Sequence, residues 1–301
     1  MKIERKTVFL CLSIFYPKKK WGVLMKAGIS TFLNLPDSRN LICNYILEIN
    51  NVSGDNLRLI LEVKRINAIT VLKSIDGFFT QFLNVELIQP EVKYKISEVK
   101  NGFLPFPPYS IQYGLYQFKK TLFFEFMDRV YMQAAFSRTI LKQSLKTSLN
   151  DLSLVPLACQ AIFLAGLRIV KFSDNNSINT IYTYFDYQID LLGCTTSQRS
   201  LLLDAYSENE EYLKQLSVDV LMCYRGETNK DNSIFMDWDL ALNSHIARYL
   251  PKRENAVNEL LYEYFDIICI QLNFDLWQKL LVSYFVRQMI LNNKLTISRC
   301  E

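Results

Sequence analysis

Histidine and glycine are scarce in this sequence. Its 301 residues include one histidine, His245, and nine thinly spread glycines. One histidine gives no basis for a histidine-based triad or a histidine-rich metal site. A lone helical histidine is more often a surface or capping residue than a catalyst, and we expect this of His245. The chain has neither a G-x-G-x-x-G motif nor a P-loop, so neither a metal nor a nucleotide cofactor is expected.

Paired cysteines are also missing. The seven cysteines are odd in number and form no C-x-x-C pair. Most lie in apolar runs, such as Cys11 within residues 8–12 and Cys269 within residues 267–270. Reduced, buried cysteines of a cytosolic protein explain this pattern better than disulfides or zinc.

Targeting and membrane segments are not expected either. The short apolar stretch near the N-terminus is followed by Pro17 and three lysines instead of a small-residue cleavage site, so no signal peptide is predicted. No uninterrupted apolar run approaches the length of a membrane span. We therefore expect a cytoplasmic protein without a membrane partner.

A strong charge of one sign is absent as well. The net charge of +4 comes from 34 basic and 30 acidic groups, which is too small an excess for a nucleic-acid footprint. The basic clusters at 18–20 and 252–253 are short and predict solvated surface. Half of the residues are hydrophobic, which is typical of a globular protein with a buried core.

The first hundred residues alternate between strand and helix patterns. Hydrophobic periodicity and turn residues predict strands at 7–15, 41–49, 57–63 and 92–96, and helices at 21–35 and 68–83. Strand, helix, two strands, helix, strand is the order of a ferredoxin-like split βαβ unit.

The rest of the chain reads as helix. A proline-containing loop is predicted at 99–112, and helix from Leu115 onward, ending with a helix over 276–295. Breaks are expected near residues 150–154, 173–177, 194–196, 226–233 and 251–253. We predict an α+β protein, with a ferredoxin-like α/β portion at 1–100 packed on a larger, mainly helical portion at 101–301 as one compact unit. Near Thr195, Ser197–Ser200 is interpreted as a capped helix start.

Three short segments carry the clearest signal. Residues 54–61 read GDNLRLIL, residues 108–114 read PYSIQYG, and residues 288–295 read QMILNNKL, shortly after Ser283. In this order they resemble the C-terminal elimination domain of lantibiotic dehydratases and the related stand-alone thiopeptide enzymes, whose motifs are GxHLRLRL, ExxRYGG and S…HMxxNRL. The resemblance covers essentially the whole chain.

The matches and the departures are both informative. The residues that match the motifs include Arg58, Tyr113, Gly114, Met289 and Asn292. The family's charged or histidine positions are instead occupied by Asn56, Ile60, Tyr109, Gln112, Gln288 and Asn293.

These departures argue against elimination chemistry. Removing glutamate from a glutamylated Ser or Thr needs a base for the α-proton and cations for the leaving carboxylate. The family uses arginine, glutamate and histidine for these tasks, and here one arginine, Arg58, remains. The sequence therefore predicts that the protein is not a dehydratase.

The resemblance extends to thiopeptide pyridine synthases, which share this fold. They join two dehydroalanines of one azole-containing peptide by a formal four-plus-two cycloaddition, and then lose water and the leader peptide. Holding two distant alkenes face to face is an entropic task that a preorganised site can perform. Neutral hydroxyl and amide donors suffice to hold a backbone amide as its iminol.

We interpret the chain as such a pyridine synthase, acting without a cofactor. The expected partner is a precursor peptide with a leader and an azole- and dehydroalanine-bearing core; other maturation enzymes are further candidates. The predicted catalytic residues are Tyr109, Gln112, Ser283, Tyr284 and Gln288. The predicted substrate-binding residues are Arg58, which would orient a carbonyl, and Tyr113. The three motif segments are expected to converge on one cleft.

Two other functions stay open. The protein could be the glutamate-eliminating partner, or a catalytically inactive module that binds the precursor peptide. On a purely structural interpretation, Arg58 is an ordinary strand charge, Tyr113 and Gly114 begin a helix, and Gln288 lies on the surface. Loss of charged residues is compatible with both a cyclase and an inactive module.

Overall fold

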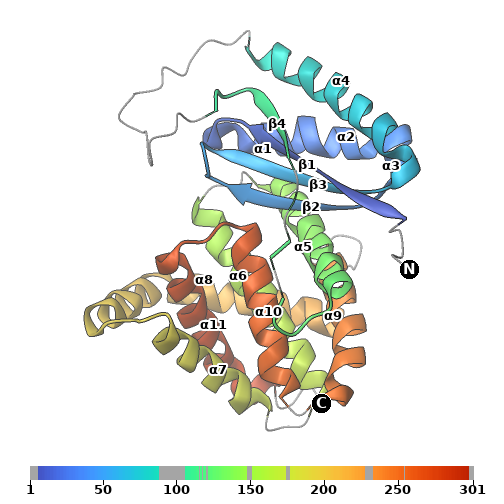
Figure 1. Ribbon diagram of the computed structural model, residues 1–301. Helices are drawn as coiled ribbons and strands as arrows, with labels where there is room; N and C mark the ends of the chain where they lie inside the picture. Colours follow the sequence, from blue (N-terminus) through green and yellow to red (C-terminus); the bar gives the residue numbers. More distant parts are fainter. Residues whose placement is uncertain are drawn as a thin grey trace. The chain divides into compact units, whose positions relative to one another are not determined.

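The computed structural model (Figure 1) describes residues 6–87, 106–114, 116, 118–119, 121–147, 151–173, 177–227, 233–253 and 255–297. The chain divides into two compact units. The sheet unit comprises Met1–Lys120 and Ile140–Asn150, and the helical unit comprises Thr121–Thr139 and Asp151–Glu301. Helices together with a small antiparallel sheet make the protein α+β, as predicted.

The sheet has four strands in the order β2-β3-β1-β4, and all neighbours are antiparallel. The strands are β1 (Thr7–Phe15), β2 (Ile42–Asn50), β3 (Asn56–Lys64) and β4 (Ser110–Gly114). The first three confirm the predicted strands. The strand predicted at 92–96 lies outside the described residues, and the assignment of 110–112 to a loop was wrong. This strand was missed because β4 is short, follows two prolines closely, and is an edge strand of the sheet formed by the described residues.

The turn between β2 and β3 depends on two residues in the left-handed region, Ser53 (φ 63°) and Gly54 (φ 116°). Asn56 stabilises this turn, because its side-chain amide donates hydrogen bonds to the carbonyls of Val52 (3.2 Å) and Gly54 (2.8 Å). The asparagine that replaces the family's histidine therefore has a structural role.

One face of the sheet is apolar and covered by helices. Successive side chains of a strand point to opposite faces, so Leu12, Leu47 and Leu59, which are in register, share one face and are buried. Figure 1 shows α2 and α4 on one side of this sheet. Phe32 of α2 and Phe79 of α4 have ring centroids 5.3 Å apart. The helical segments of this unit are η1 (Lys18–Lys20), α1 (Trp21–Val23), η2 (Leu24–Ser30), α2 (Thr31–Asn34), α3 (Pro36–Leu41), η3 (Arg65–Asn67) and α4 (Ala68–Leu87).

The helical unit is built around α6 (Asp151–Phe172), which contacts α7, α8, α9, α10 and α11. The other elements are α7 (Ser177–Leu191), α8 (Thr196–Arg225), α9 (Met236–Tyr249), η6 (Leu250–Lys252), α10 (Ala256–Gln271) and α11 (Leu276–Ile297). Helix α5 (Phe126–Lys146) begins in this unit. Its start at Phe126 corrects the prediction of helix from Leu115, because the chain in residues 121–125 is non-helical and bends.

Other local predictions can be compared directly. Thr195 caps α8 in a capping box with Gln198, which confirms the expected helix start. Cys11, Cys159 and Cys269 are buried thiols, also as predicted, whereas Cys43 is exposed. Residues 153–172 of α6 are long and apolar enough to cross a membrane by length and composition, but 78% of that stretch is buried in the protein, as in a core helix.

The expectation for His245 was wrong. Its side chain is 1% exposed in α9, and Nδ1 lies 2.8 Å from the hydroxyl of Tyr264. It shares the buried face of α9 with Trp238, Leu242 and Tyr249. The spacing of these apolar residues, at i, i+3 and i+4, places position 245 in the core whatever its chemical type.

Candidate functional site

A row of polar side chains crosses the sheet on the face opposite the helices. The strand register aligns Glu48 of β2 with Arg58 of β3, Arg58 with Ser13 of β1, and Ser13 with Gln112 of β4. In-register residues of an antiparallel sheet point to the same face. Arg58 and Gln112 are therefore brought together on one face, about 10 Å apart across two strand spacings.

Arg58 has a carboxylate partner that the sequence interpretation missed. Its Nη1 lies 3.9 Å from Oε2 of Glu48, whose side chain is 6% exposed. The hydroxyl of Tyr116 donates a hydrogen bond to the other oxygen of Glu48. The signal was available, because Glu48 is an acid within the apolar strand ICNYILEIN.

A buried thiol lies near this pair. The pKa of the Cys11 thiol is raised to about 11 by burial, against the opposing influence of Arg58 and with a further rise from Glu48. The thiol therefore remains protonated at neutral pH and does not add a nucleophile to the row.

Tyr113 is on the other side of the sheet. As the neighbour of Gln112 along β4 it points to the helix-covered face, where its hydroxyl donates to Oδ1 of Asp76 at 3.1 Å. Burial, and then this hydrogen bond, raise the pKa of Tyr113 to about 12. The structure thus does not bring Tyr113 together with Arg58.

Tyr109 has an unusual backbone and a cationic neighbour. Its φ of 61° lies in the left-handed region, which is costly for a tyrosine, and its N–H donates to the carbonyl of Phe15 at 2.7 Å. Lys20 Nζ lies 5.7 Å from the centre of its ring, and the ring of Tyr16 is 5.1 Å away. Both Lys20 and Tyr16 bind Glu86 of α4. Tyr109 is therefore held in a tyrosine, lysine and glutamate cluster.

The remaining predicted residues lie on α11 in the helical unit. Tyr284 and Gln288 are four residues apart and share one side of the helix. Tyr206 of α8 marks that side: its ring is 6.1 Å from that of Tyr284, and its hydroxyl accepts a hydrogen bond from Asn292 at 2.8 Å. Ser283 is fully buried, and its hydroxyl has no hydrogen-bond partner among the described residues. It points into the core instead of toward Tyr206.

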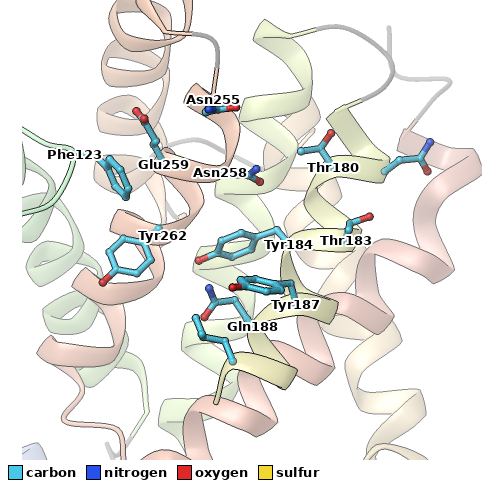
Figure 2. Close-up of a pocket in the computed structure, with 12 residues that line it drawn as sticks. Phe123, Thr180, Thr183, Tyr184, Tyr187, Gln188, Asn255, Asn258, Glu259 and Tyr262 are labelled. Carbon is cyan, nitrogen blue, oxygen red and sulfur yellow. The ribbon is translucent and has the colours of Figure 1, made fainter. Parts of the chain in front are cut away.

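A pocket that the sequence interpretation did not predict lies between α7 and α10 (Figure 2). Its volume is about 840 Å³. The lining residues are Phe123, Asn179, Thr180, Thr183, Tyr184, Tyr187, Gln188, Leu191, Asn255, Asn258, Glu259 and Tyr262. Aromatic rings and carboxamides predominate. The sequence carried no signal for this pocket, because the exposure of an aromatic residue such as Tyr187, which is 60% exposed on α7, is known only from the structure.

The pocket contains an unpaired buried hydroxyl. Tyr184 is 7% exposed, and its hydroxyl has no hydrogen-bond partner in the described part of the chain. Burial, followed by the influence of Cys269, Tyr262 and Asp266, raises the pKa of Tyr184 well above its ordinary value. It is therefore a neutral phenol that can donate a proton in a hydrogen bond. An unsatisfied buried polar group costs roughly 1–3 kcal/mol, which a bound ligand could recover.

One acid of the pocket wall is already paired. Glu259 accepts a hydrogen bond from the hydroxyl of Tyr249 at 2.7 Å, and its Oε2 lies 3.2 Å from Nη1 of Arg253. Across the described residues, no group of three or more His, Cys, Asp and Glu side chains could hold a metal ion.

The fold places the chain in a structural class. It is the lantibiotic-dehydratase-like fold, and the whole-chain resemblance predicted from the three motifs is confirmed at the level of the fold. Pyridine synthase TbtD from thiomuracin biosynthesis is similar with a TM-score of 0.67 and 12% identity, over 94% of this chain and 98% of that chain.

Two further solved structures share the fold. TsrL has a TM-score of 0.63 and 11% identity, over 96% of this chain and 95% of its own. The tRNA-dependent lantibiotic dehydratase MibB from Microbispora sp. 107891 has a TM-score of 0.64 and 9% identity, and this chain covers 29% of it. No family model matches the chain, and no curated protein sequence matches it.

Proposed function

We propose that this protein is a peptide-maturing pyridine synthase, which joins two dehydroalanines of an azole-containing precursor peptide. The observation that carries the proposal is the pairing of Arg58 with buried Glu48. Elimination of glutamate needs uncompensated cations around a leaving carboxylate. Here the remaining motif arginine already has an acid beside it, and Gln112 stands where the family's second motif has an arginine.

The proposed reaction needs positioning and proton transfer more than charge. The four-plus-two step forms a six-membered ring from two alkenes and an amide held as its iminol. Loss of water, and then of the leader peptide as a carboxamide, leaves the pyridine. Tyr109 and Tyr284 would transfer protons, while Gln112 and Gln288 would hold amide groups and Arg58 would bind the peptide. Ser283, which is buried, and Tyr113, which faces the helix-covered side of the sheet, have no direct contact with the substrate in this scheme. No cofactor takes part.

We also propose the predicted domain organisation, with a ferredoxin-like portion at 1–100 and a mainly helical portion at 101–301. The strand order β2-β3-β1-β4 with antiparallel neighbours supports a ferredoxin-like N-terminal portion. Its edge strand β4 carries Gln112, and an exposed edge can add a peptide strand, such as a leader. A cytoplasmic location and convergence of the motif segments on one cleft also remain predictions.

A second candidate is an inactive module that binds the precursor peptide. The complete burial of Ser283, a predicted catalytic residue, favours it. One experiment separates the candidates: a dehydrated, azole-bearing precursor is incubated with this protein alone and followed by mass spectrometry. A cyclase releases macrocycle and leader carboxamide in equal amounts. An unchanged but bound precursor would establish the inactive module instead.

A further inference from the structure

The pocket between α7 and α10 has a lining that selects for an uncharged ligand. Glu259 is the one charged side chain among its twelve lining residues, and its Oε2 accepts a hydrogen bond from Tyr249 and pairs with Arg253. A ligand anion finds no cation among the lining residues, and a ligand cation finds only a carboxylate whose charge Arg253 already offsets, while either would lose its hydration.

The walls offer two complementary kinds of contact. Tyr187 from α7 and Tyr262 from α10 present aromatic rings, and Phe123 adds a third. The carboxamides of Asn255 and Asn258 can donate to and accept from a peptide backbone. Asn179 offers its amide N–H groups, because its Oδ1 accepts a hydrogen bond from Lys294 Nζ at 2.7 Å. Flat aromatic or heteroaromatic groups pack well against such rings, while the amides fix the peptide bonds between them.

Tyr184 supplies the specific polar contact. Figure 2 shows its hydroxyl pointing from α7 toward α10, into the space between the helices. Its oxygen is closed to solvent and has no partner in the described part of the chain, so a ligand acceptor that reaches it by a shift of the neighbouring side chains would complete its hydrogen bonding. An azole nitrogen is an acceptor in the plane of a flat ring, which fits a donor set among aromatic side chains.

We propose that this pocket binds a neutral, azole-bearing segment of the precursor peptide, with the Tyr184 hydroxyl donating to an azole nitrogen. The identity of the peptide rests on the proposed function. The volume of about 840 Å³ lies in the range of ligand sites and accommodates a segment of a few residues, not a whole macrocycle.

The test measures binding without chemistry. The probe is a bithiazole dipeptide capped at both ends, titrated into the whole protein by calorimetry. The wild type should bind it, and should bind the same compound with a free carboxylate more weakly. Tyr184→Phe should weaken binding of the capped probe about two- to tenfold, the range for one neutral hydrogen bond. Tyr212→Phe, which alters an exposed tyrosine of α8, should leave it unchanged.

A second variant covers the case in which Tyr184→Phe fails to fold. Asn258 is exposed on α10, so Asn258→Trp should fill the pocket without disturbing the core and should abolish probe binding. Absence of probe binding by the wild type, or equal binding by Asn258→Trp, overturns the proposal. The precursor assay is scored separately: probe binding without cyclisation contradicts the pyridine-synthase assignment, and cyclisation without probe binding contradicts the pocket assignment.

Discussion

Arg129 and Glu263 form an ion pair inside the helical unit, with guanidinium Nη1 2.9 Å from carboxylate Oε2. Their side chains are 3% and 0% exposed. The other oxygen of Glu263 accepts hydrogen bonds from the backbone N–H groups of Leu122 (3.0 Å) and Phe123 (2.9 Å). The pair therefore fastens the turn that precedes α5 to α10, and through that turn it fixes Phe123 in the wall of the pocket.

This arrangement predicts a large cost for removing one partner. Glu263→Ala leaves the Arg129 cation buried with only Asp266 and frees two backbone donors. We expect a loss of about 3–5 kcal/mol in the free energy of unfolding, the cost of breaking a buried pair. Urea denaturation measures it. Arg199→Ala, which breaks an exposed pair with Asp190, is the control and should cost about 1 kcal/mol or less. Equal effects of the two changes would contradict the structural role.

His245 predicts a pH dependence of stability. Burial, with opposing influences from Asp128 (raising) and Arg248 (lowering), lowers the pKa of His245 from 6.5 to about 4. Its Nε2 lies 3.7 Å from Asp128, and Tyr264 faces Nδ1. The unfolded chain binds the proton more readily than the folded protein does. Neutral His245 therefore contributes to the free energy of unfolding above pH 6.5, and this contribution is lost as the pH falls toward 4. Between pH 7 and pH 5 the loss should be about 2 kcal/mol.

The control variant is His245→Asn, which keeps a polar side chain that does not titrate in this pH range. Its overall stability will be lower, but its change in unfolding free energy between pH 7 and pH 5 should be smaller than that of the wild type. Urea midpoints at both pH values give the difference. An identical pH dependence in the two proteins would show that folding does not lower the pKa of His245.

Arg58 should contribute mainly to substrate affinity. Under the proposed function, Arg58→Ala removes a charged donor to a peptide carbonyl, so the precursor should bind about 10- to 100-fold more weakly. The rate at saturating precursor should change less, because the arginine binds and does not transfer protons. Lys64→Ala, at the exposed end of the same strand, is the control. Undiminished affinity in Arg58→Ala would place the precursor elsewhere.

The sequence predicted the helices and strands more accurately than the candidate functional site. Strands β1 and β3 and helix α4 have long periodic patterns, and their predicted bounds are close to the observed ones. Alternation along β3 predicts the face on which Arg58 lies, but β4, which carries Gln112, was not predicted, and no sequence pattern gives the register that aligns the two residues. The pocket joins α7 and α10, which are far apart in the chain, so tertiary packing alone defines it.

We also expect the cyclisation activity to be independent of metal ions. Exhaustive chelation followed by dialysis should leave cyclisation of the precursor unchanged, because the proposed proton transfers use tyrosine hydroxyls and the binding groups are amides and Arg58. The measurement is the rate of macrocycle formation before and after treatment, with zinc added back to a third sample. Loss on chelation and recovery with zinc would contradict the cofactor-free mechanism.

The chemical step should depend on two hydroxyl groups. Tyr109→Phe and Tyr284→Phe each remove only an oxygen, so the rings keep their packing against Tyr16 and Tyr206 and the fold should survive. If these tyrosines transfer protons, each change should slow cyclisation by about a hundredfold to ten-thousandfold.

Gln288→Ala should have a milder effect, because this residue is proposed to position an amide. Tyr131→Phe, an exposed tyrosine of α5, serves as the control for tyrosine replacement. Precursor binding and the cyclisation rate are measured for each variant, so that a loss of affinity is separated from a loss of chemistry.

Because Tyr109 and Tyr284 belong to different units of the chain, a large rate effect from both would require that the motif segments share one site. Unchanged cyclisation in Tyr109→Phe, Tyr284→Phe and Gln288→Ala would place the chemistry elsewhere, and glutamate release from a glutamylated peptide by the wild type would establish elimination as the activity.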